Sequence, residues 1–387
     1  MDNKNNINVI DFGSSKIRFS VFDKELNEKH SDNKSIEYEN NYSQHLKEIK
    51  LIVKNAEKNI STHIEDLILT LDPEKLFTID LTLKKKLDNK MDIMKIYETL
   101  ILELKQIIIT YYDELEIMHI IFSGCIIDNK FYLNLPKEKN KINNIKIDFK
   151  IICCPKKIIL NIKNIFNKIN IKVTNYFCTS YVKSLSYLRK LSLEKASFLE
   201  IGYKKTNFIC YENKKLKFIQ SIPIGGMHIT KDISNIFKIT YVEAEKIKRS
   251  FNKSETEFSY ENKLNEKNLL ISEILKKNIS IDLLKKVILY RIQEIFDLTF
   301  TRSNIHNYNM NFRTSDLFFI GEGAILLNNN SFYLRDKFEF KSLSFYDEKD
   351  SQICNSILTY HLNNPQLPTR INKKRGLFEK FFYLFGK

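Results

Sequence analysis

The sequence predicts a mixed α/β protein whose two related lobes face a cleft. Two similar blocks support this prediction, because each has the pattern of a strand, a tight loop and a further strand. The blocks begin at residues 7 and 196, about 190 residues apart. The 387 residues are also too many for one ordinary core, and segments with helical spacing of apolar residues separate the blocks.

The individual elements follow from the spacing of apolar residues and from the turn residues between them. Strands are expected within residues 7–22, where two are joined by a tight loop, and at 118–122, 145–152, 196–201, 208–211, 216–222 and 317–320. Helices are expected at 44–58, 91–112, 156–168, 179–191, near Thr230, near Tyr241, at 281–300 and at 350–361. Thr240 and Glu243 have the spacing of a capping box. Residues 252–268 are polar, which is typical of a surface insertion.

The net charge of +15 does not by itself indicate a nucleic-acid partner. Lysines are spread along the chain, and its richness in Lys, Asn and Ile, with no Trp and nine Gly, is typical of AT-rich coding. We therefore expect a solvated basic surface and no bound nucleic acid. No apolar run reaches about 18 residues, and the polar residues 1–8 do not resemble a signal peptide, so a cytoplasmic body is expected.

Six cysteines lie among apolar neighbours, and none forms a C-x-x-C pair. The seven histidines also lack the spacing of metal ligands. This pattern predicts buried free thiols in a reducing compartment.

Six of the nine glycines fall in or beside three short loops that each follow a strand. In the first loop, a bend at Gly13 would expose the backbone N–H groups of Ser14 and Ser15, which can cradle a phosphate. Lys16 adds a positive charge for a phosphate, and Asp11 at the strand end can hold hydrated Mg²⁺. An ordinary polar hairpin is the alternative interpretation of this loop.

Two stretches carry a resemblance to a known family. Residues 9–18 (VIDFGSSKIR) resemble the first phosphate motif of the actin superfamily, in the form that FtsA proteins use. Residues 222–233 (IPIGGMHITKDI) are similar to the FtsA stretch that follows the second phosphate loop. Residues 243–248 resemble the family's adenosine-contacting helix, 319–324 its adenosine-side glycine loop, and 291–296 the long helix before that loop.

The resemblance implies an actin-like two-lobed ATPase fold made of ribonuclease H-like repeats, with an FtsA-type inserted subdomain and a C-terminal amphipathic helix. Residues 1–79 and 154–195 would form the first lobe, and 80–153 the inserted subdomain. Residues 196–361 would form the second lobe, with 227–300 as its outer subdomain. A linker at 362–375 and a membrane-targeting helix at 376–387 would complete the chain.

The resemblance also implies ATP and Mg²⁺ as ligands of the cleft. The residues that match the family's nucleotide site are Asp11, Gly13, Ser14, Ser15, Lys16, Gly202, Gly225, Gly226, Glu245, Lys248, Gly321, Gly323 and Ala324. Asp11 and Glu200 would hold the metal through water, and Glu200 is the one possible catalytic residue.

The second phosphate loop departs from the family pattern, which has an Asp and three glycines before a Thr. Here only Gly202 and the acidic Glu200 remain, and Tyr203 and Lys204 place side chains where bare backbone should approach the phosphates. We therefore expect ATP binding with weak or no hydrolysis. A purely structural turn is the alternative.

The last residues predict a short amphipathic helix. At about 100° per residue, its apolar side chains fall within an arc of roughly 160°, with Lys380 on the other side. The residues expected to contact lipid are Leu377, Phe378, Lys380, Phe381, Phe382, Leu384 and Phe385. A helix of this length rises only about 16 Å, so it would lie in the interface of an anionic membrane rather than cross it. A core helix that docks back on the body is the alternative.

Together these features predict a peripheral protein on the cytoplasmic face of the inner membrane at the division site. The resemblance implies that it tethers the FtsZ ring by binding the FtsZ C-terminal peptide, self-associates into filaments and meets other divisome proteins. Lys285, Lys286 and Arg291 are candidate contacts for that peptide, although a solvated helix face is the alternative. A PilM-like pilus-assembly ATPase and a degenerate kinase of the same superfamily are the competing functions.

Overall fold

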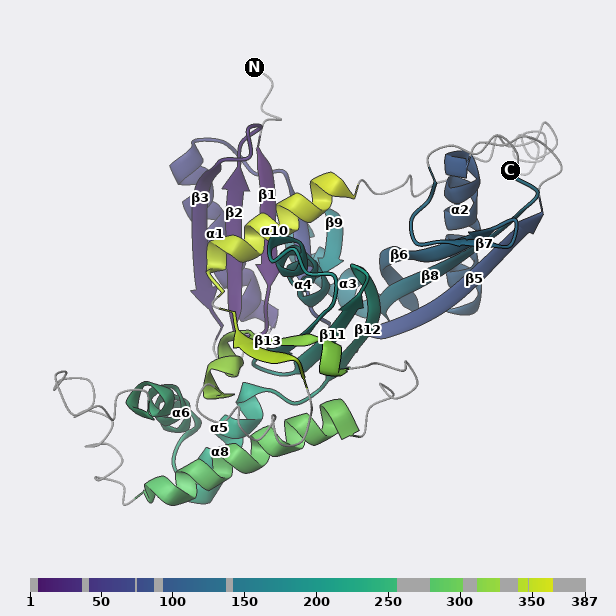
Figure 1. Cartoon of the computed structure of the whole chain (residues 1–387). Helices are drawn as coiled ribbons and strands as arrows, with labels where there is room; N and C mark the ends of the chain where they lie inside the picture. Colours follow the sequence, from purple (N-terminus) through teal and green to yellow (C-terminus); the bar gives the residue numbers. More distant parts are fainter. Residues whose placement is uncertain are drawn as a thin grey trace.

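The computed structural model describes residues 6–36, 42–73, 75–86, 93–136, 142–255, 279–301, 312–327, 340–346 and 348–364. Within these residues, strands form two five-stranded sheets and one four-stranded sheet, and helices cover them (Figure 1). The mixed α/β class expected from the sequence is confirmed.

The first five-stranded sheet has the order β3-β2-β1-β4-β9. Strands β1, β2 and β3 are antiparallel neighbours, whereas β4 pairs in parallel with both β1 and β9. The strands are β1 (Ile7–Phe12), β2 (Lys16–Phe22), β3 (Glu28–Ser35), β4 (Asp66–Leu71) and β9 (Lys172–Cys178). Apolar side chains of this sheet and of α1 (Tyr42–Ile60), α3 (Lys156–Asn167) and α4 (Thr179–Lys190) share one core.

The second five-stranded sheet repeats this topology, with the order β12-β11-β10-β13-β14. Its first three strands are antiparallel neighbours, and β13 pairs in parallel with β10 and β14. The strands are β10 (Ala196–Ile201), β11 (Thr206–Glu212), β12 (Lys215–Ile222), β13 (Asp316–Ile320) and β14 (Ser342–Phe345). The repeat places the ends of β1, β4, β10 and β13 at matching edges of the sheets, where ligands of parallel sheets bind.

A four-stranded antiparallel sheet, of order β5-β8-β6-β7, forms a separate layer. Figure 1 shows it projecting from the body with α2 (Ile93–Tyr111) against it. Its own apolar core joins α2 to the sheet. The strands are β5 (Phe77–Lys86), β6 (Leu115–Ile127), β7 (Lys130–Tyr132) and β8 (Asn144–Pro155).

Three helices cover the second sheet on the side away from the first: α5 (Gly226–Phe237), α6 (Tyr241–Glu255) and α8 (Ile281–Phe296). The expectation of a helix start near Thr230 was wrong, because α5 begins at Gly226 and Thr230 lies inside it. The capping box at α6 is confirmed, since the Glu243 carboxylate accepts from the Thr240 N–H at 2.9 Å. A π-helical turn, Asp297–Thr301, follows α8.

The last described helix, α10 (Asp350–Asn363), packs against β1, β2 and α4. It extends two residues into the segment expected to be a linker. The expected tail helix at 376–387 lies outside the described residues. None of the described helices has the length and hydropathy of a membrane-spanning segment. All six cysteines are buried free thiols, as expected.

Candidate functional site: a cleft between the two five-stranded sheets

A cavity of about 650 Å³ opens between the two five-stranded sheets. Its walls come from the ends of β1, β4, β10 and β13, from α4 and from the start of α10. The lining residues with charged side chains are Asp11, Lys16, Arg18, Asp72, Lys183, Glu200, Lys205, Glu322, Glu348, Lys349 and Asp350. The cavity therefore joins strand ends of both lobes, as expected for a cleft.

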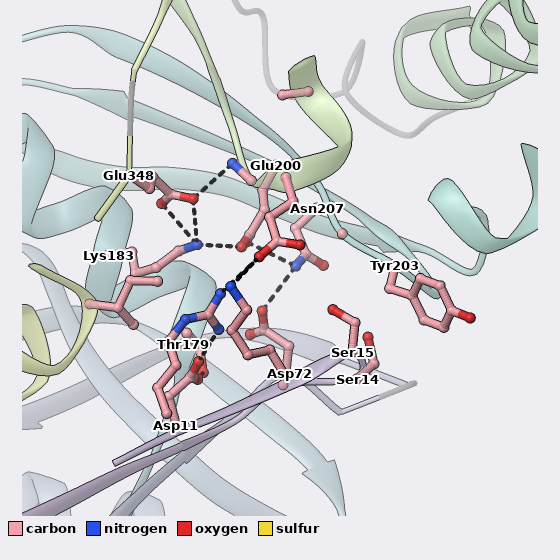
Figure 2. Close-up of a pocket in the computed structure, with 18 of the residues that line it drawn as sticks. Asp11, Ser14, Ser15, Asp72, Thr179, Lys183, Glu200, Tyr203, Asn207 and Glu348 are labelled. Carbon is pink, nitrogen blue, oxygen red and sulfur yellow. Dashed lines mark hydrogen bonds and ion pairs between the residues drawn. The ribbon is translucent and has the colours of Figure 1, made fainter. Parts of the chain in front are cut away.

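The first phosphate loop lies where β1 turns into β2. Gly13, Ser14, Ser15 and Lys16 all line the cavity, and Figure 2 shows the two serine side chains together at one side of it. This part of the predicted nucleotide site is brought together in the cleft. Its role in binding phosphate stays a prediction.

Asp11, at the end of β1, is bonded through both carboxylate oxygens to the protein itself. One oxygen accepts from the hydroxyls of Thr70 at 3.2 Å and Thr179 at 2.8 Å. The other oxygen accepts from the Arg18 guanidinium at 2.9 Å. The side chain of Asp11 is 3% exposed, so these contacts replace water almost completely.

Cations on β2 connect the first sheet to the rest of the cleft. Lys16 lies 2.7 Å from Glu322, in the short helix η4 (Glu322–Leu327), and 3.4 Å from Asp350 at the start of α10. Arg18 contacts Asp350 at 2.5 Å. Burial opposes the ionised form of Asp350, but the bond and charge of Arg18 outweigh it, so the pKa of Asp350 lies below its ordinary value.

Glu200, at the end of β10, is bound by a buried lysine that the sequence analysis missed. Lys183, on α4, lies 2.5 Å from Glu200 and 2.9 Å from Glu348 (Figure 2). Glu348 also accepts from the Tyr187 hydroxyl and from the Gly321 N–H, each at 2.8 Å. Burial would lower the pKa of Lys183, but the two carboxylates raise it well above its ordinary value.

The second phosphate loop is closed by the start of α5. The Gly226 and Met227 N–H groups donate to the carbonyls of Gly202 and Tyr203, at 2.9 and 2.7 Å. A side chain at Gly225 would place its Cβ 2.5 Å from the Gly202 oxygen, so this close approach requires glycine. The N–H groups at this end of α5 therefore hold the loop itself.

Glu245 and Lys248, two of the residues expected to contact adenosine, lie together beside the start of α5. Lys248 lies 2.7 Å from Glu245 and donates to the Gly226 carbonyl at 3.0 Å. Gly321 lines the cavity and needs glycine, because its φ is +86°. Ala324 also lines the cavity.

Gly225, Gly226, Glu245, Lys248 and Gly323 lie in described segments but outside the cavity lining. The structure therefore places only some of the predicted nucleotide residues in the cavity lining.

Several cleft residues escaped the sequence analysis. Asp72 follows β4 and accepts from the N–H and hydroxyl of Ser180, both at 3.0 Å, and from Asn207 at 3.2 Å. An acidic residue directly after an apolar strand was a signal that could have identified Asp72. Lys183 and Glu348 carried no such signal, because only the fold brings α4 and the segment before α10 to β10.

The expected Mg²⁺ site does not fit this arrangement. Magnesium binds through a few carboxylates that are free to contact the ion or its waters. Asp11 and Glu200 instead bond to cations and hydroxyl or amide donors of the chain. Among the described residues, no group of three or more His, Cys, Asp or Glu side chains could hold a metal ion.

A second hollow, of about 360 Å³, lies on the surface between α5 and α8. Its lining residues are Asp232, Ile236, Leu283, Lys286, Val287, Tyr290, Arg291 and Glu294. We call this hollow the α5–α8 groove.

Of the three predicted peptide contacts, Lys286 and Arg291 line the α5–α8 groove, and Lys285 lies beside it in sequence. The Arg291 guanidinium donates two hydrogen bonds to Asp232, at 2.7 and 2.8 Å, and also contacts Glu294. The Arg291 guanidinium is therefore already paired within the chain, and contact of any of the three with a peptide stays a prediction.

The comparisons with known proteins agree with this architecture. A structure described as a PilM-PilN type IV pilus biogenesis complex has a TM-score of 0.61, with 11% sequence identity, and covers 93% of this chain and 98% of that one. The duplicated sheets and this likeness show the actin-like ATPase fold expected from the sequence.

Within that class, residues 198–338 match the family model of the cell division protein FtsA. Two FtsA proteins of Staphylococcus epidermidis strains are 25% and 27% identical over 138 and 139 residues. The resemblance to FtsA is thereby confirmed over the second lobe. These matches span 36% of this chain and 30% of the length of each relative.

Proposed function

We propose that this protein is an FtsA-type division protein that anchors the FtsZ ring to the cytoplasmic membrane. The observation that carries the proposal is the FtsA match over residues 198–338, since this segment contains the second phosphate loop and both helices of the α5–α8 groove. As an actin-like protein it would bind ATP in the cleft and self-associate into filaments. It would meet other divisome proteins at the membrane.

The cleft supports nucleotide binding better than hydrolysis. Its volume of about 650 Å³ is in the range of small-molecule sites, and the first phosphate loop lies open to it. Hydrolysis needs a group that orients or deprotonates the attacking water. Glu200, the one possible catalytic residue, is instead 2.5 Å from Lys183 and bonded to Asn207. ATP would therefore act as an assembly ligand with little or no turnover.

The α5–α8 groove has the chemistry expected for the FtsZ tail, which is usually apolar with acidic residues. Ile236, Leu283 and Tyr290 are 49%, 43% and 69% exposed in the groove, so they leave apolar surface for a partner to cover. Lys286 supplies a cation beside them. A peptide that buries these side chains and places a carboxylate near Lys286 would satisfy both features.

Membrane attachment would come from the tail at residues 376–387. Full burial of its six large apolar side chains would contribute roughly 9–18 kcal/mol, and partial burial much less. Each basic residue adds about 1 kcal/mol near anionic lipid. One molecule would therefore bind reversibly, whereas a filament with many tails would bind firmly.

The proposal is tested by titrating the full chain with a peptide of the FtsZ C-terminus from the same organism. Binding is expected, and Tyr290→Ala in the groove should weaken it about tenfold or more, because an aromatic anchor is lost. Tyr111→Ala is the matched control, since this tyrosine is 76% exposed on α2 of the inserted layer. No binding, or equal effects of both variants, would contradict the proposed partner site.

The competing function is that of a PilM-like pilus protein. The observation in its favour is that the structural likeness to the PilM-PilN complex extends over nearly all of both chains. A parallel titration with a PilN peptide separates the two. Binding of PilN in place of FtsZ would establish the pilus function.

A further inference from the structure

The two carboxylates expected to hold Mg²⁺ are bound to fixed cations of the chain. Asp11 bonds to Arg18 at 2.9 Å, and Glu200 to Lys183 at 2.5 Å. Lys183 and Arg18 have side chains only 4% and 14% exposed, so solvent screens these pairs little. Breaking such a buried pair would leave an uncompensated charge, which is strongly unfavourable.

The surroundings of Lys183 resemble a cation site filled by an ammonium group. Its Nζ lies between Glu200 and Glu348, which come from β10 and from the segment before α10 (Figure 2). Glu348 is in turn fixed by Tyr187 and by the Gly321 N–H. The ammonium group thus connects α4 to two acidic side chains of the second lobe, a task that a divalent ion could otherwise perform.

The charge balance of the whole cavity agrees with this interpretation. Its lining contains six carboxylates and five Lys or Arg side chains, which leaves a formal charge of −1. A divalent ion is attracted by clustered carboxylates that lack partners. Since the chain itself supplies almost one cation for each carboxylate, little such attraction remains.

We propose that Lys183 and Arg18 take the place of a protein-bound divalent cation, so that the cleft binds adenine nucleotide without Mg²⁺. The inference rests on the proposed nucleotide site. It adds that the protein contributes no direct or water-mediated metal ligand through Asp11 or Glu200. Nucleotide phosphates would instead meet the backbone of the first phosphate loop, and Lys183 would hold α4 against Glu200 and Glu348.

The first test is calorimetric titration of the full chain with ADP, in buffer with Mg²⁺ and in buffer with EDTA. The dissociation constants are expected to agree within about threefold. A loss of more than about tenfold in EDTA would overturn the inference. Absence of ADP binding in both buffers would refute the proposed nucleotide site. The Mn²⁺ titration described next would then decide by itself whether Lys183 and Arg18 replace a metal ion.

The second test is a titration with Mn²⁺, a paramagnetic substitute for Mg²⁺, followed by electron paramagnetic resonance. The parent protein is expected to bind none in the cleft, whereas Lys183→Met frees Glu200 and Glu348 and should create a Mn²⁺ site. Lys349→Met, at an exposed lysine that lines the same cavity, is the matched control and should create none.

Three results of this titration would overturn the inference. One is Mn²⁺ bound to the parent and removed by Glu200→Gln. Another is a folded Lys183→Met protein that binds no more Mn²⁺ than the parent. If Lys183→Met does not fold, Arg18→Gln replaces it, because this variant frees Asp11, and failure to gain Mn²⁺ binding there counts in the same way.

Discussion

His119 makes the stability of this protein depend on pH in a way that one substitution should remove. Its imidazole is 3% exposed on β6, where Nε2 accepts from the Cys178 N–H at 2.8 Å and Nδ1 lies 2.9 Å from the Tyr360 hydroxyl. The neutral ring thus connects the inserted layer, the end of β9 and α10. Burial lowers the pKa of His119 from 6.5 to about 3.

The magnitude follows from proton linkage. The folded pKa is depressed, so below pH 6.5 the unfolded chain binds a proton that the folded protein excludes. Stability from this residue is therefore complete above pH 6.5 and falls as the pH decreases toward about 3. At about pH 5 the loss is roughly 1.5 pKa units, or about 2 kcal/mol.

The perturbation is His119→Gln, whose amide does not titrate. Urea unfolding followed by far-UV circular dichroism, at about pH 7.5 and about pH 5, gives the free energy of unfolding at each pH. The decrease between the two values should be about 2 kcal/mol smaller in the variant than in the parent. Other histidines contribute equally to both proteins and cancel in this comparison.

Ile109→Gln is the matched control, because this side chain is 62% exposed on α2 and carries no ionisable group. It should leave the pH dependence of the parent unchanged. If His119→Gln shows the same decrease as the parent within about 0.5 kcal/mol, the buried neutral state of His119 is refuted.

Two further substitutions, each with a control variant, test contacts in and beside the cleft. Gly225→Ala should destabilise the protein by about 1–3 kcal/mol, because its Cβ would lie 2.5 Å from a backbone oxygen. At Gly226→Ala the nearest atom is a lysine Nζ at 3.4 Å, so a smaller loss is expected, and equal losses would contradict the loop closure described above. Arg18→Met should cost about 3–5 kcal/mol, because Asp11 would be left buried and unpaired. Arg249→Met breaks a pair whose arginine side chain is 64% exposed and should cost at most about 1 kcal/mol; similar denaturation midpoints for these two variants would refute the role assigned to Arg18.

The elements that sequence patterns predicted have strong apolar periodicity, but the apolar strand β4, with five of its six residues buried, was not among the expected strands. β10 is buried at every residue and α8 buries one face, so both were expected near their observed positions. β3 was missed because its residues, EKHSDNKS, have no buried apolar side chain and pair only along one edge. The start of α5 was misplaced because two glycines begin it, and only tertiary contact with the second phosphate loop stabilises them there.

The candidate site shows the same division. Its phosphate loops could be predicted, since glycines and an acidic residue at the end of a strand indicate such a loop from neighbouring sequence alone. Its ion pairs could not, because Lys183 and Glu348 are separated by 165 residues and meet only in the folded protein. A lysine within an amphipathic helix has the same local pattern whether it faces water or two carboxylates. The sequence analysis assigned Glu200 to a metal ion and did not foresee its ion pair with Lys183.

The measurement that tests the central claim most directly is the recruitment of fluorescent FtsZ to anionic vesicles. The full chain should bring FtsZ to the membrane. Deletion of residues 377–387 should abolish recruitment by detaching the protein from lipid, and Tyr290→Ala should reduce it by weakening the FtsZ contact. Tyr111→Ala should recruit normally. FtsZ that reaches the vesicles equally well with the deleted chain, or remains in solution with the full chain, would contradict the proposed tether.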